Sequence, residues 1–146
     1  MYSSLTVHDG VTAQALTATP VKLTGFATQG PDASTRTGDQ AAVGVLASDH
    51  IAVKAGLIYR IAFHLSAAFS AAAVVEIHAR FGTTELPGIA ASRDVVATSG
   101  VDKNLGYSAE GIYVPTADGN ISLYGETTSN GNLTPVHGQL VVQQIG

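Results

Sequence analysis

The sequence predicts an all-β protein that folds as a single antiparallel β-sandwich or barrel. Lys and Glu, which favour helices, are scarce, whereas Thr and Val, which favour strands, are frequent. Sixteen glycines and five prolines divide the chain into short segments. Because 146 residues make one ordinary domain, about eight to ten short strands separated by turns fit one sandwich.

The N-terminal third is predicted to contain short strands and exposed connections. Residues 1–13 are expected to form an N-terminal arm, and residues 14–146 the β-domain. The turn-forming residues of Gln29–Gln40 predict a long exposed loop. The strands expected in this region are Ala13–Ala18, Val21–Phe26, Ala42–Leu46 and Ile51–Val53.

The segment Leu57–Ser66 is the clearest strand of the sequence. Every second residue is large and apolar, which assigns one face to the core: Leu57, Tyr59, Ile61, Phe63 and Leu65. The opposite face mixes apolar, charged and neutral polar residues: Ile58, Arg60, Ala62, His64 and Ser66. Buried mixtures of this kind are typical of subunit contacts.

The C-terminal half is predicted to continue the same alternation of strands and turns. SAAFSAAA, residues 66–73, is expected to form a loop in preference to a short helical turn. Hairpin turns are expected at ADGN (117–120) and SNGN (129–132). The expected strands are Val74–Phe81, Gly88–Ser92, Val95–Thr98, Leu105–Val114, Asn120–Glu126 and Gly138–Ile145.

Net charge and amino-acid composition restrict the functions that we expect of this protein. Charged residues are 12% of the chain, about half the usual ~25%. A protein that covers much of its surface with copies of itself needs less surface charge. The net charge is −4 without a basic run, which argues against nucleic-acid binding. No apolar stretch approaches the ~20 residues of a membrane span. MYSSLTVHDG has neither the charged start nor the apolar run of a secretion signal, so we do not expect these residues to act as one.

The sequence offers little support for catalysis, a metal or a cofactor. Cysteine is absent, and the five histidines lack the close spacing of a zinc site. His64 and His78 are expected on the outward faces of neighbouring strands, where together with Glu76 they could converge on a metal. A shared outward face in a subunit contact is the preferred interpretation of these two histidines. Ser108 lies inside a predicted strand, without the turn that exposes a catalytic serine. We therefore expect no enzyme activity, no metal and no cofactor.

Four segments in succession resemble a known fold family. IAVKAGLIYRIAFHLS, VVEIHARFGT, GYSAEGIYVPTADGNISLYGE and GQLVVQQIG are similar to the jelly-roll domain of the tumour necrosis factor and complement globular-head type. Gly56, Tyr59 and Phe63 match the first strand of its central region, and Val114 followed by ADGN matches a later strand and turn. The chain has Asp118-Gly119 where many members have Gly-Asp. The resemblance covers roughly Ile51 to the C-terminus and implies a β-jelly roll.

The upstream segment QALTATPVKLTGF resembles the start of small tailed-phage virion proteins that decorate the capsid as trimers. This resemblance implies a homotrimeric decoration, or cement, protein on the outer capsid surface of the virion. The trimer interface is then expected at Ile58, Arg60, His64, Tyr107 and Tyr113. Contacts with the major capsid protein are expected from the N-terminal arm, at Tyr2, Leu5, Val7 and His8.

Two other classes of function stay open. A receptor- or glycan-binding head or tail-fibre tip domain would present outer loops such as Gln29–Gln40 to the host. The sequence lacks the repeats of a fibre stalk, which counts against this alternative. A glycan-processing enzyme on a jelly roll is the third class, because the fold alone does not decide function.

Overall fold

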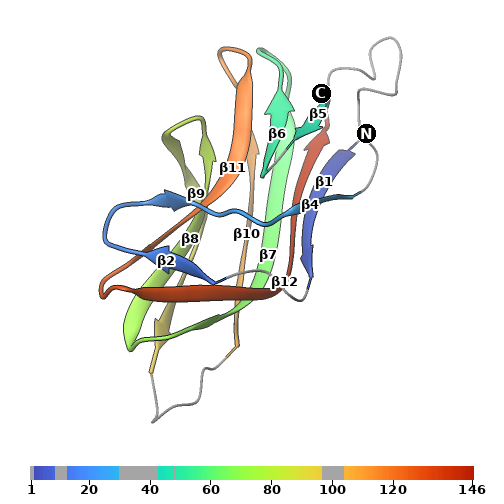
Figure 1. Ribbon diagram of the computed structural model, residues 1–146. Coiled ribbons are helices and arrows are strands. Elements are labelled where there is room, and N and C mark those ends of the chain that lie inside the picture. The colour runs from blue at the N-terminus through green and yellow to red at the C-terminus, as the bar shows by residue number, and fades with distance from the viewer. Residues whose placement is uncertain (1, 9–12, 30–42, 48, 97–103) are drawn as a thin grey trace.

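The computed structural model is built from strands in two stacked sheets (Figure 1). It describes residues 2–8, 13–29, 43–47, 49–96 and 104–146. In the strands β1 (Tyr2–His8), β4 (Ala27–Gln29) and β5 (Val43–Ala47), it describes the backbone and, among the side chains, that of Ser4. Every described pair of neighbouring strands is antiparallel. Among the described residues there is no helix long and apolar enough to cross a membrane.

The two sheets contain six strands each. Sheet A has the order β10-β7-β12-β1-β4, with β2 paired to β12. Its strands are β1 (Tyr2–His8), β2 (Gln14–Leu16), β4 (Ala27–Gln29), β7 (Tyr59–Phe69), β10 (Leu105–Tyr113) and β12 (Gly131–Gln144). Sheet B has the order β5-β6-β11-β8-β9, with β3 paired to β11. Its strands are β3 (Val21–Lys22), β5 (Val43–Ala47), β6 (His50–Val53), β8 (Ala73–Phe81), β9 (Thr84–Val95) and β11 (Gly119–Thr127).

One hydrophobic core fills the space between the sheets. From sheet A, β7 contributes Tyr59, Ile61, Phe63 and Leu65, as the alternation predicts, with Leu57 packed at their edge. From sheet B, β8 contributes Val75, Ile77 and Ala79, each fully buried. The prediction of an all-β antiparallel sandwich is therefore confirmed.

The connections between strands define a jelly roll. The chain passes from one sheet to the other between β7 and β8, β9 and β10, β10 and β11, and β11 and β12. The predicted hairpins at 117–120 and 129–132 are therefore wrong, because the strands on either side of each turn belong to different sheets. Asp-Gly and Asn-Gly signal a reversal of the chain, but the pairing of the flanking strands depends on distant residues.

Several strands are longer than predicted. Residues 66–73, expected as a loop, continue β7 to Phe69 and begin β8 at Ala73, because Ala67 and Phe69 fill the core. The expected strand Gly88–Ser92 is part of the longer β9, whose pairing with β8 shifts register near Gly88, a residue with φ of 84°. Val95 ends that strand, and residues 97–98 lie outside the described part. β12 begins at Gly131, and its register shifts between Pro135 and His137.

The N-terminal segment, expected as an arm, contains a strand of the sandwich. β1 pairs with β12 over seven residues, from Tyr2 opposite Gln143 to His8 opposite His137. Its other edge pairs with β4, a strand that the sequence analysis did not anticipate. Residues 9–12, and the expected loop beyond Gln29, lie outside the described part of the chain.

Candidate functional site: the outer face of sheet A

Four aliphatic side chains are exposed together at one end of the outer face of sheet A. We name this group the apolar row, and its exposed fractions are Ile58 39%, Ile112 59%, Val114 46% and Ile145 50%. They are four of the six exposed large hydrophobic residues found in the described ranges. Clustered exposed apolar side chains often mark a protein contact.

The strand register explains why these residues meet. Ile58 immediately precedes β7. Its backbone N donates to Gly146 O, and its backbone O accepts from Ile145 N, each at 2.8 Å. On the other side of β7, Tyr113 lies opposite Tyr59, so the same register brings Val114 opposite Ile58. Ile112 lies opposite Arg60, two pairs along from Val114 and Ile58. The row therefore lies across the ends of three adjacent strands, β10, β7 and β12.

The part of this face formed by β7 and β10, next to the apolar row, is nearly neutral. Arg60 on β7 forms an ion pair with Glu110 on β10, which cancels the two charges. Beside this pair lies a shallow hollow of about 220 Å³, lined by Ala62, Phe63, Ser108, Ala109 and Glu110. A face with cancelled charge and small side chains can approach another protein surface closely.

The structure separates the predicted interface residues into two groups. Ile58, Arg60 and His64 are exposed on the outer face, as the alternation indicates. Tyr107 is 1% exposed and belongs to the core, so its assignment to an interface is corrected. Tyr113 also points to the core side, half-buried against Phe81 with ring centroids 5.6 Å apart. Both rings point inward because their neighbours Ser108 and Ile112 occupy the outward positions of β10.

Sequence reasoning missed three members of the apolar row: Ile112, Val114 and Ile145. The signal was present, since Glu110, Ile112 and Val114 alternate with the inward residues of β10. Recognising the row required the pairing of β10 and β12 with β7, which no local pattern encodes.

Two loops, residues 54–58 and 114–118, each contain one member of the apolar row and are joined by hydrogen bonds. The carboxylate of Asp118 accepts hydrogen bonds from Ala55 N (2.9 Å) and Lys54 Nζ (2.8 Å). Gly56 N donates to Pro115 O (2.8 Å), and Lys54 N donates to the hydroxyl of Tyr59 (2.9 Å).

These contacts also change the acidity of the groups that make them. The hydrogen bonds from Lys54 and Ala55 lower the pKa of Asp118, and the bond to Asp118 raises the pKa of Lys54. Burial raises the pKa of Tyr59. Both ends of the ion pair are therefore charged over a wide range of pH around neutrality.

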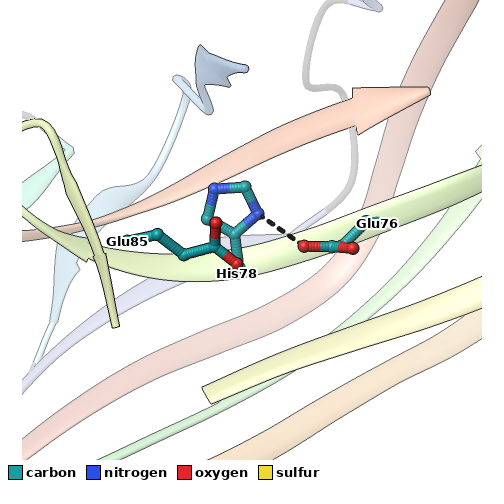
Figure 2. Close-up of side chains that lie close together, drawn as sticks. All are labelled: Glu76, His78 and Glu85. Atoms are coloured by element: carbon teal, nitrogen blue, oxygen red, sulfur yellow. Dashed lines mark ion pairs between the residues drawn. The ribbon is translucent and has the colours of Figure 1, made fainter. Parts of the chain in front are cut away.

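A cluster of titratable residues lies on the outer face of sheet B (Figure 2). Glu76, His78 and Glu85 each offer one ligand atom, and these atoms lie within 4.8 Å of one another. His78 is fully buried, with Nδ1 3.2 Å from Glu76 Oε1. At this distance the two atoms are close, but they do not form a hydrogen bond.

The ring nitrogens of His78 do not fit a metal ion. Arg80 Nε donates to His78 Nε2 at 2.9 Å, and an arginine always carries this proton. Nε2 therefore keeps its lone pair for Arg80, and the proton of the neutral ring lies on Nδ1, facing Glu76. The Arg80 guanidinium is in turn 4.8 Å above the ring of Tyr124. The arrangement is a carboxylate, imidazole and guanidinium network that holds β8 side chains in place.

The other chemical groupings that the sequence suggests do not form sites in the described residues. His64 lies on sheet A and His78 on sheet B, so they do not converge on a metal with Glu76. Ser108 lies opposite His64 on the adjacent strand, but the next residue across the sheet is Gln139, an amide that does not act as the acid of a triad. The expected capsid-contact residues Tyr2, Leu5, Val7 and His8 lie on β1, and their side chains are outside the described part.

Comparison with known proteins identifies the fold. A scan of protein-family models finds no match, and no curated protein matches the chain. Among solved structures, the chain is similar to the Eiger tumour necrosis factor from S. frugiperda, with a TM-score of 0.56. The match covers 99% of this chain and 93% of that chain at 9% sequence identity. The protein therefore has a tumour necrosis factor-like jelly-roll fold.

Proposed function

We propose that the protein is a homotrimeric decoration protein that binds the outer capsid surface of a tailed phage and stabilises the shell without catalysing a reaction. The observation that carries the proposal is the apolar row on a nearly neutral sheet face. Three copies that cover this face would remove the four aliphatic side chains from water, which favours association. A charged fraction of 12% agrees with a surface that is partly covered.

The proposed mechanism is mechanical. A trimer that contacts neighbouring capsid subunits binds the assembled lattice better than separated subunits, so its binding free energy favours the assembled state. In this proposal the major capsid protein contacts β1, at Tyr2, Leu5, Val7 and His8. The pairing of β1 with β12 gives that contact a sheet strand as its support.

The test is binding to capsids assembled without the protein. We expect the protein to co-sediment with these capsids and to raise the temperature at which they release DNA. The substitution Ile112→Asp should weaken both effects, because a trimer presents three contacts at once and a monomer presents one. Failure of the wild-type protein to co-sediment would contradict the proposal and favour a receptor- or glycan-binding tip domain, which a glycan array would then test.

A further inference from the structure

We infer that Asp118 is a positioning residue for the apolar row: it fixes the loop 54–58 against the loop 114–118, so that both present their aliphatic residues in one arrangement. The inference rests on the proposed homotrimer, because it assigns the row to contact with a second copy of this chain. Asp118 itself is exposed, and it acts through the residues that it holds.

The contacts of Asp118 reach the loop backbone. One carboxylate oxygen accepts the Ala55 amide hydrogen at 2.9 Å, and the other accepts from the Lys54 side chain at 2.8 Å. A surface ion pair alone contributes little to stability, because water and salt screen it. The bond to Ala55 is different, since it fixes the backbone of a turn that contains Gly56, whose φ is 76°.

The two loops lead directly into the apolar row. The loop 54–58 ends at Ile58, and the loop 114–118 begins at Val114. Gly56 N donates to Pro115 O, so the loops are joined at a second point, and they lie side by side at the upper end of the sandwich (Figure 1). On the other side of Ile58, the backbones of Ile145 and Gly146 complete the support.

This support matters for association because ordering a loop during binding costs free energy. A loop that already holds its contact residues in place loses less conformational freedom when a partner covers it. Without the Asp118 carboxylate, Ala55 loses its acceptor, and Ile58 and Val114 lose one of the ties between their loops. We therefore expect weaker association without loss of the fold.

The test compares three substitutions in the full-length protein. Asp118→Ala removes both bonds, Asp118→Asn keeps an oxygen for Ala55, and Lys54→Met removes only the ion pair. Subunit exchange between differently labelled wild-type or variant trimers measures dissociation, and hydrogen exchange of the Ala55 amide measures the turn. Thermal unfolding checks that each variant is folded.

We expect Asp118→Ala to speed subunit exchange by about tenfold, roughly the effect of one lost hydrogen bond, and to speed hydrogen exchange at Ala55. The subunit exchange rates of Asp118→Asn and Lys54→Met should stay within about threefold of the wild-type rate. If Asp118 acted through its charge alone, these two variants would speed exchange as much as Asp118→Ala does. Equal exchange in all variants, or equal acceleration in all three, would overturn the inference while leaving the trimer intact. A monomeric wild-type protein would refute the proposed function, and the positioning role with it.

Discussion

Replacing Ile112 with aspartate should separate the copies of this protein without unfolding them. Ile112 is 59% exposed in the single chain, and full burial of an isoleucine contributes about 1.5–3 kcal/mol. Covering its exposed part therefore contributes about 1–2 kcal/mol per copy, and this gain is lost in the variant. An aspartate would add the cost of removing a carboxylate from water next to Glu110, which lies two residues away on the same face. In a trimer this loss occurs three times.

Sedimentation velocity at micromolar concentration measures the outcome, and far-UV circular dichroism verifies the strand content. The matched control is Val96→Asp, because Val96 is 60% exposed and lies outside the apolar row. We expect the Ile112 variant to sediment as a monomer and the Val96 variant to sediment as the wild type does. Trimers of unchanged strength in the Ile112 variant, or equal weakening in both variants, would refute the assignment of the interface to the apolar row.

Individual side chains give four further predictions. The pKa of the Asp118 carboxyl is lowered in the folded protein. Its stabilising effect is therefore present above the unfolded-state pKa of about 3.9 and is lost as pH falls through the folded-state value. The melting temperatures of Asp118→Asn and the wild type should converge only in acid. Tyr59→Phe should cost about 1 kcal/mol in chemical denaturation, because Lys54 N loses its acceptor. Tyr107→Phe should cost nothing, since its hydroxyl has no partner in the described residues. Zinc should raise the melting temperature of the wild type no more than that of His78→Asn; a saturable increase in the wild type alone would disprove the His78 network.

The fold could be predicted from the sequence as far as side-chain alternation extends. In Leu57–Ser66 the alternation correctly assigned inward and outward residues, because this strand has one face in the core. Strand pairing was not predictable in the same way. The turn at ADGN joins strands of different sheets, since its local chemistry specifies a reversal and the packing of the whole chain specifies the partner.

The candidate site was predictable in part for the same reason. Ile58, Arg60 and His64 could be assigned to an outward face, but the apolar row needed three strands in register. His78 shows the complementary difficulty. Alternation correctly placed it on the outward face of β8, yet it is fully buried, because alternation reports the direction of a side chain and neighbouring side chains decide its exposure.

The solution mass of the wild-type protein tests the central claim most directly, because the proposed decoration function depends on copies that cover sheet A. One chain has a mass of 14.9 kDa. Light scattering coupled to size-exclusion chromatography at micromolar concentration should give three times this mass. A single species with the mass of one chain would contradict the account.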